Sequence, residues 1–122
     1  MKYALLIYAA PGAHEQAGPA PAGVITDWVA YTRAVKESGG LLGAERLATT
    51  DTATSVRVRG EDRLLTDGPF METKEHLLGF FLIDVPDLDT ALDWAARMPA
   101  AASGTVEVRA VRTGEPWQAV LG

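Results

Sequence analysis

Residues 78–85 carry the sequence LGFFLIDV, the most apolar run of this chain. Alternate residues of a β-strand point to opposite faces of its sheet, and in this run both sets are apolar. One set is Phe81, Ile83 and Val85, and the other is Phe80 and Leu82. Such a strand is typical of the centre of a sheet that is covered on both sides. Residues 3–8, YALLIY, have the same character and predict a second central strand.

Two helices are predicted, one after each central strand. Over residues 23–38 the apolar side chains recur at helical spacing, and Gly39-Gly40 supplies a C-terminal cap. A second helix begins at Asp87, which stands where an N-cap belongs, and ends before Pro99. Its expected buried stripe is Leu88, Ala91, Leu92, Ala95 and Met98.

The remaining strands are predicted from simple alternation. Residues 55–59 and 63–66 flank a turn at residues 60–62 and form a plausible hairpin, while residues 105–112 form a last strand. Residues 41–47 are either an extended segment or a short strand. The order strand, helix, hairpin, helix, strand predicts an α+β fold of the ferredoxin-like βαββαβ type, with two helices on one face of an antiparallel sheet. One domain accounts for residues 1–122.

The two helices cover one face of this sheet only. The central strands are apolar on the other face too, and a soluble monomer rarely exposes an apolar patch of several hundred Å². The economical cover is a second copy of the same sheet, packed face to face about a two-fold axis. The sequence therefore predicts a homodimer.

Composition excludes several classes of protein. The net charge of −5 argues against non-specific nucleic-acid binding, and no apolar run reaches the roughly 18 residues of a membrane span. The chain has two histidines and no cysteine, so neither disulfides nor a dedicated metal site is expected. It also lacks a phosphate-cradling glycine loop and a dinucleotide fingerprint, so no cofactor is predicted. A cytoplasmic location is the default.

The edge strands supply one site hypothesis. If the valines of residues 55–59 and 105–112 point toward the helices, then Arg57, Arg59, Glu107 and Arg109 point away from them, at opposite edges of an apolar floor. A cleft with an apolar floor and a few convergent charges is typical of a small-ligand site, and guanidinium groups suit a carboxylate or a phosphate. The alternative is that these arginines are solvated or form salt bridges across the dimer interface.

The ten residues 67–76, DGPFMETKEH, supply another hypothesis. Asp67 is a candidate general base or ligand acceptor, or else it caps the turn. Phe70 either stacks on a ligand or plugs the core. Glu72 and Lys74, with Glu75, place a cation between two carboxylates, which either tunes a carboxyl pKa for binding and catalysis or only forms ion pairs in a solvated loop.

This ten-residue stretch resembles the signature of the DGPF (DGPFAETKE) branch of the YCII-related proteins. The resemblance extends over nearly the whole chain, from residues 1–8 to residues 106–109. It implies a dimeric α+β barrel of ferredoxin-like subunits and a site around the signature loop. Other YCII-related proteins have a histidine–aspartate pair near the first helix, but residues 23–38 contain no histidine, so that chemistry does not transfer.

Three functions follow from these observations. The first is an enzyme or binding protein for a small molecule, with a cavity between the subunits. The second is a regulatory protein that docks an alternative sigma factor of the ECF type, because some members of the family resemble proteins found beside such factors. The third is a stable dimer whose cavity is packed core. Fold alone does not choose among them.

Overall fold

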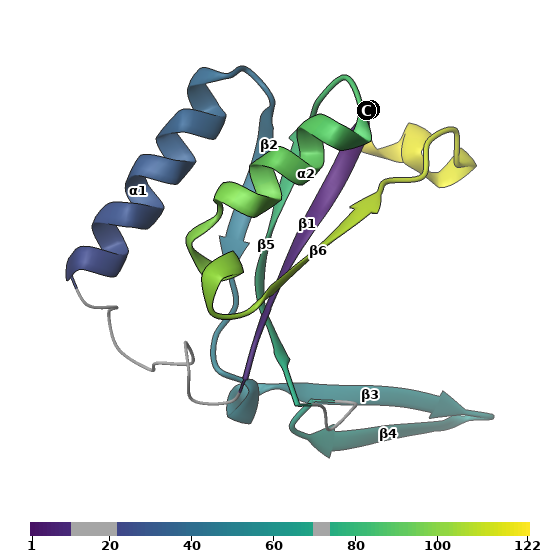
Figure 1. The fold of residues 1–122 in the computed structure, drawn as a ribbon. Coiled ribbons are helices and arrows are strands. Elements are labelled where there is room, and N and C mark those ends of the chain that lie inside the picture. Colours follow the sequence, from purple (N-terminus) through teal and green to yellow (C-terminus); the bar gives the residue numbers. More distant parts are fainter. Residues whose placement is uncertain (11–21, 70–73) are drawn as a thin grey trace.

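The computed structural model describes residues 1–10, 22–69 and 74–122 (Figure 1). Its strands are β1 (Lys2–Ala9), β2 (Leu41–Arg46), β3 (Thr54–Arg59), β4 (Asp62–Asp67), β5 (His76–Asp84) and β6 (Thr105–Ala110). Its α-helices are α1 (Ala22–Glu37) and α2 (Leu88–Arg97). Three short 3₁₀ segments complete it: η1 (Thr50–Thr52), η2 (Pro99–Ala102) and η3 (Pro116–Leu121).

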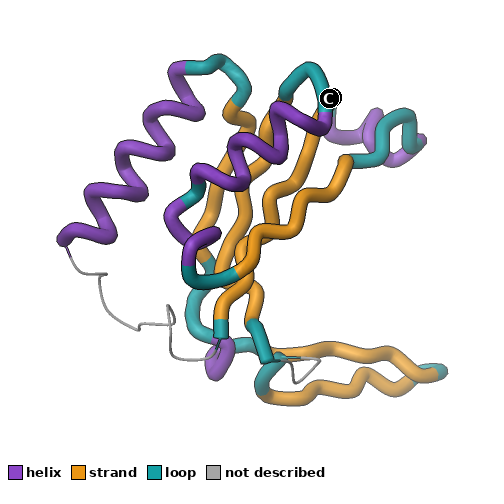
Figure 2. The backbone as a smooth tube through the Cα atoms, viewed as in Figure 1, coloured by secondary structure: helices purple, strands orange, loops and turns teal. Residues whose placement is uncertain are grey.

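Four strands form one antiparallel sheet in the order β2-β5-β1-β6, and both α-helices lie on the same side of it (Figure 2). The predicted central strands are thus central, and the predicted class, α+β with an antiparallel sheet and two main helices, is confirmed. Strands β3 and β4 form a separate two-stranded sheet. We call these two strands the hairpin.

The position of the hairpin corrects one prediction. The second strand of the main sheet is β2, and the hairpin is an insertion between β2 and β5. The reason lies in the packing. Leu41 and Ala44 of β2 pair with β5 and pack against the core, whereas Val56 and Val58 of β3 are 55% and 61% exposed and face no helix.

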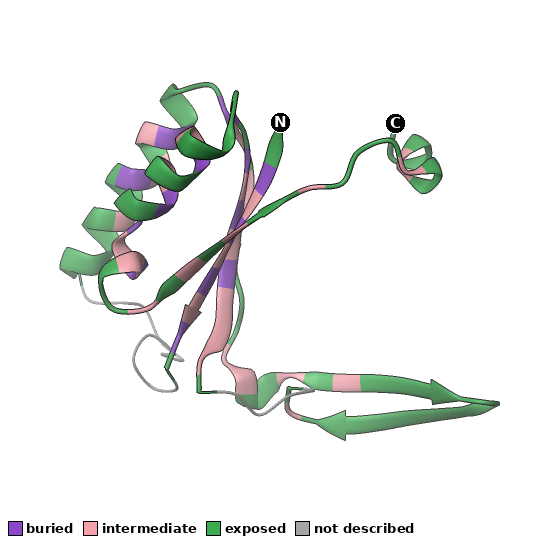
Figure 3. Cartoon of the chain, turned by 45° about the vertical axis from the view of Figure 1, so that its right-hand side comes forward, coloured by how far each residue is buried: buried purple, intermediate pink, exposed green. Residues whose placement is uncertain are grey.

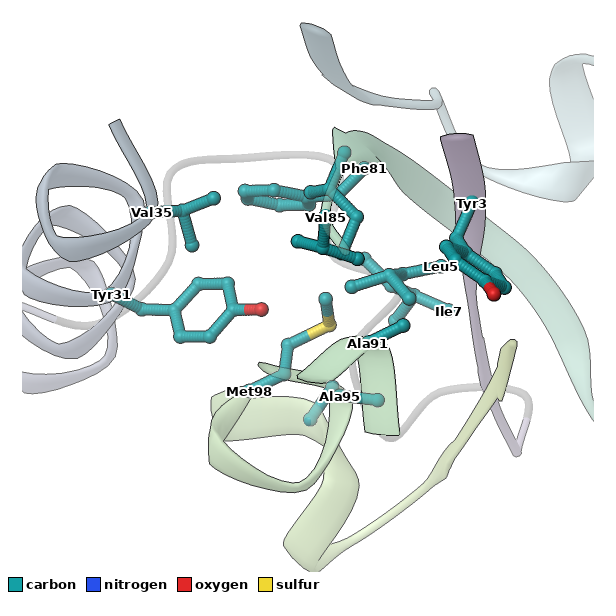
Figure 4. Packing of buried hydrophobic residues seen from close by; sticks show 12 residues of the cluster. Tyr3, Leu5, Ile7, Tyr31, Val35, Phe81, Val85, Ala91, Ala95 and Met98 are labelled. Carbon is teal, nitrogen blue, oxygen red and sulfur yellow. The ribbon is translucent and has the colours of Figure 1, made fainter. Parts of the chain in front are cut away.

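The core lies between the helices and one face of the sheet (Figure 4). Strand β1 shows how the face is chosen, because Tyr3, Leu5, Ile7 and Ala9 are buried while the residues between them are only half-buried. The other buried apolar side chains are Tyr31, Val35, Phe81, Ile83, Val85, Ala91, Ala95, Met98 and Ala100.

The stripe predicted for α2 is only partly buried. Ala91, Ala95 and Met98 face the sheet, but Leu88 and Leu92 are 49% and 45% exposed, so their assignment to the core was wrong. The buried stripe of α2 is therefore narrow and largely alanine, while the two leucines lie outside it. At the start of α2, Asp87 is the predicted N-cap, and its Oδ1 accepts the backbone N–H of Thr90 at 2.9 Å.

The two helices are tied together by Tyr31. Its ring meets Trp28, Phe81 and Trp94 at centroid distances of 5.4–6.0 Å, and its hydroxyl donates to the backbone oxygen of Trp94 at 2.8 Å. These aromatic residues belong to the core or pack against it. Burial raises the pKa of Tyr31 to about 12 from an ordinary value of 10.0, and the nearby charge of Arg97 lowers this pKa by a smaller amount.

This pKa predicts a loss of stability at high pH. The unfolded phenol ionises near pH 10.0 and the folded one near 12. The stability that comes from holding Tyr31 neutral is thus complete below pH 10 and is lost as the pH rises to 12. Urea unfolding should therefore show a steeper decline over this window for the wild type than for Tyr31→Phe. At pH 7 the variant should lose about 1 kcal/mol with its hydrogen bond. Equal slopes for the two proteins would contradict the prediction.

Candidate functional site

The side of the sheet away from the helices carries apolar side chains. Cross-strand partners share a face, and the register pairs Leu6 with Phe80 and Ala4 with Leu82. We call this surface, which includes Tyr8, the open face. Its apolar members are half-buried by their neighbours within the sheet. No described element lies over it, because both α-helices lie on the other side in Figure 3. The sequence prediction of an apolar face without cover from the helices is confirmed for the described residues.

The hairpin projects from one end of the sheet on the open side (Figure 3). One of its faces holds a pocket of about 280 Å³. We call this the hairpin pocket, and its lining residues are Ser55, Arg57, Leu64, Thr66 and Pro69.

Strand register and a glycine turn build the hairpin pocket. Ser55 pairs with Thr66, and Arg57 pairs with Leu64, so these four side chains share one face of the hairpin. Gly68 then turns the chain at φ 92°, a value that suits glycine, and its N–H donates to the oxygen of Ala53 at 2.7 Å. The Ser55 hydroxyl donates to the oxygen of Gly68 at 2.9 Å and fixes the strand to this turn.

The hairpin pocket offers suitable groups for an anion. The Arg57 guanidinium is a fixed fork of donors, Thr66 adds a hydroxyl, and Leu64 and Pro69 add apolar surface. The serine and threonine were missed in the sequence analysis. The signal was present, because both occupy the same alternating set as Arg57 in a predicted hairpin.

The predicted placement of Arg57 and the last strand at opposite edges of one sheet was wrong within one subunit. Arg57 lies on the hairpin, while Glu107 and Arg109 lie on β6, so they are not at opposite edges of one sheet. Glu107 pairs with Leu6 and Arg109 with Ala4, which places both on the open face as predicted. The cause is again the insertion of the hairpin outside the main sheet.

The signature stretch is described at its two ends. Asp67 is exposed and pairs with Thr54, on the opposite face of the hairpin from Arg57. Lys74 is exposed as well. The predicted ligand residues Phe70 and Glu72 lie outside the described residues.

The far end of the signature is anchored by polar contacts that the sequence did not reveal. His76 Nδ1 lies 3.0 Å from the Thr50 hydroxyl of η1, and Thr105 of β6 donates to Glu75 Oε1 at 3.3 Å. Both contacts join residues that are far apart in the sequence, which local spacing does not predict. Across the described ranges, histidine and acidic side chains form no cluster of three or more that could hold a metal. In the same ranges no helix has the length and apolarity needed to cross a bilayer.

A larger surface hollow of about 410 Å³ lies along α1 and the end of α2. Its most enclosed polar group, the Tyr31 hydroxyl, is committed to the backbone of Trp94, and its Arg97 guanidinium stacks on the Trp94 ring at 4.4 Å. The Tyr31 hydroxyl thus links α1 to α2, and the Arg97 guanidinium is engaged in a contact within α2. The hairpin pocket, beside the signature stretch, is the better candidate for a ligand.

The sequence of this chain is similar to that of known proteins. A model of the YCII-related domain matches residues 1–118. An uncharacterized protein of Rhizobium meliloti (strain 1021) is 41% identical over 95 residues, which cover 76% of this chain and 77% of that protein.

Proposed function

This chain belongs to the YCII-related family, and we propose that it works as a homodimer that binds a small organic anion between its subunits. The observation that carries this proposal is the open face, an apolar surface beside a projecting hairpin that holds an arginine-lined pocket. The dimer supplies the cover, and the hairpin pocket supplies the anion site.

Two features of the described residues support the dimer. The first is the open face, whose apolar side chains need cover from water. The second is the hairpin, which has exposed apolar side chains on both faces and no core of its own. A lone two-stranded hairpin is at best marginally stable in water. A second copy that packs against the open face and the hairpin covers the first and stabilises the second. In a two-fold dimer both subunits gain these contacts.

The chemistry of the hairpin pocket supports an anionic ligand. Arg57 can form paired hydrogen bonds with a carboxylate or a phosphate, and Thr66 can add a third. The apolar part of the ligand would rest on Leu64, Pro69 and the nearby end of the open face. This arrangement gives ligand contact to Arg57 rather than to Asp67, which lies on the other face of the hairpin. A general-base role for Asp67 stays a prediction, as does docking of a sigma factor.

The test compares two arginines of β3. A panel of small carboxylates and phosphates is screened by thermal shift and then by calorimetry, against wild type, Arg57→Gln and Arg59→Gln. Both arginines are exposed and belong to the same alternating set, but Arg59 is not part of the pocket lining. Loss of a charge-assisted hydrogen bond costs about 1.5–3 kcal/mol, so Arg57→Gln should weaken binding roughly 10- to 100-fold. Arg59→Gln should leave the affinity unchanged.

Three outcomes would contradict the proposal. Equal weakening by both variants would mean that the ligand responds only to the total charge of the hairpin. A wild-type protein that shows no response to the panel, or that stays monomeric in solution scattering, would remove the ligand site or the dimer respectively.

A further inference from the structure

Two projections of the chain bound the open face at its opposite ends. The hairpin leaves the sheet at the end marked by the Ala9–His76 pair. The C-terminal segment, residues 111–122, leaves it at the other end, where Tyr3 pairs with Ala110. In Figure 3 both projections extend on the open side of the sheet.

The C-terminal segment is ordered by its own contacts. Glu115 and Gln118 form a reciprocal capping box at the start of η3, and the Gln118 amide donates to the Arg112 oxygen at 3.0 Å. Arg112 and Glu115 form an ion pair at 2.9 Å. Three large hydrophobic side chains stay exposed on this segment, namely Trp117 (61%), Val120 (87%) and Leu121 (77%). A preformed apolar segment loses little conformational entropy when it docks.

Charges on the open face distinguish two ways of placing a second copy. Glu107, Leu6, Phe80 and Glu45 lie in one row across the sheet, with the two carboxylates at opposite edges. Arg109 lies in the neighbouring row, at the same edge as Glu107. A two-fold axis along the strands would lay Glu107 over the partner's Glu45, which is repulsive. A two-fold axis across the strands can instead lay Arg109 over the partner's Glu107, and this pair occurs twice.

We propose that the two-fold axis of the dimer runs across the strands, so that Arg109 faces the partner's Glu107 and each C-terminal segment packs on the partner's hairpin. The second contact follows from the first. An axis across the strands reverses the strand direction and brings the C-terminal end of one sheet over the hairpin end of the other. This inference rests on the proposed homodimer. It gives a packing partner to both projections of each subunit, the hairpin and the C-terminal segment.

In this arrangement a residue from the second copy supports the hairpin that carries the proposed ligand site. Trp117 of the partner subunit would lie against the apolar face of the hairpin, beside exposed Val58. The same hairpin carries Arg57 and the hairpin pocket on its other face. A hairpin that is packed against the partner's C-terminal segment holds Arg57 in place for the anion. Each anion site therefore depends on both subunits.

Charge reversal tests the orientation. Sedimentation equilibrium measures the dimer dissociation constant for Glu107→Arg, Arg109→Glu and the double variant. Each single change places like charges together and should weaken the dimer about tenfold or more, and the double change should restore it. If the axis runs along the strands, Glu107→Arg would face the partner's Glu45 and tighten the dimer. Tightening, or a double variant no better than the singles, would overturn the proposal.

Cross-linking directly tests the contact between the C-terminal segment and the partner's hairpin. Because the chain has no cysteine, Val58→Cys and Val120→Cys each introduce a single thiol at an exposed position. The two variants are treated with a short bis-maleimide linker, separately and as a co-refolded mixture. The mixture alone should give a covalent dimer on a denaturing gel. A covalent dimer from either variant by itself would indicate hairpin against hairpin or segment against segment, and would overturn the proposal.

The two proposals fail in different ways. A wild-type protein that is monomeric in solution scattering removes the homodimer and with it this inference. If the wild type is dimeric but the cysteine variants give no cross-link in any sample, or give the wrong one, the contact between the C-terminal segment and the partner's hairpin is removed and the homodimer stays in place.

Discussion

Replacing Leu6 by glutamate is expected to separate the dimer while each subunit stays folded. Leu6 lies near the middle of the open face, beside Phe80 and Glu107. In a monomer the new carboxylate is exposed to water and costs little. In the dimer it would be buried without a partner, at several kcal/mol per subunit, and the two-fold axis applies this cost twice. The dimer should therefore dissociate roughly 10⁴-fold more readily or more. Sedimentation equilibrium measures this change, and circular dichroism checks the fold.

Leu92→Glu is the matched control. It makes the same chemical change at an exposed position of α2, on the helix side of the molecule. It should leave the dimer intact. If Leu6→Glu stays dimeric, or if both variants dissociate alike, the open face is not the dimer interface.

The neighbouring residue should respond in the opposite way. Leu5→Ala is expected to lower the free energy of unfolding by about 2–5 kcal/mol and to leave the dimer interface untouched. Leu5 is fully buried on the helix side of the sheet, where it pairs with Phe81 and Val108. Truncation removes buried apolar surface and leaves a cavity that packed neighbours fill only in part. Urea unfolding measures the loss, at one fixed protein concentration so that the linkage to dimerisation stays constant.

Leu88→Ala provides the comparison for this second prediction. It removes the same atoms from a leucine of α2 that is 49% exposed. Its cost should be a small part of that at Leu5, with the same slope of unfolding free energy against urea. Equal losses at the two positions would contradict the assignment of the core to the helix side of the sheet.

The sequence predicted the central architecture because several local signals agreed there. Residues 3–8 and 78–85 are apolar on both faces, which only a central strand requires. The first helix ends before Gly39-Gly40, and the second begins after Asp87, as expected. Each of these signals has a local cause, namely burial on two sides, a C-terminal cap and an N-terminal cap.

The place of the hairpin could not be predicted from the same kind of signal. Alternation of apolar and polar residues predicts that residues 55–59 form a strand with two unlike faces, but it does not show which surface covers the apolar one. The true second strand, residues 41–46 with the sequence LLGAER, has a glycine and two charges, so it appeared the weaker candidate. Its pairing with β5 depends on contacts between residues about 40 positions apart.

The candidate site was predicted in part for the same reason. Arg57 lines the hairpin pocket, and Glu107 and Arg109 lie on the open face, while ligand binding by these residues stays a prediction. Their juxtaposition in one subunit was wrong because it assumed one sheet. The polar contacts of His76 with Thr50 and of Glu75 with Thr105 are tertiary contacts, so they cannot be predicted from the spacing of residues along the chain.

If the proposed homodimer forms, the projecting hairpin would make ligand binding depend on the abundance of the protein itself. A β-ribbon that becomes rigid only when a second copy of the chain packs on it would bind its ligand weakly at low protein concentration and tightly at high protein concentration. Occupancy would then climb faster than the copy number of the chain, so that modest induction of expression acts as a threshold.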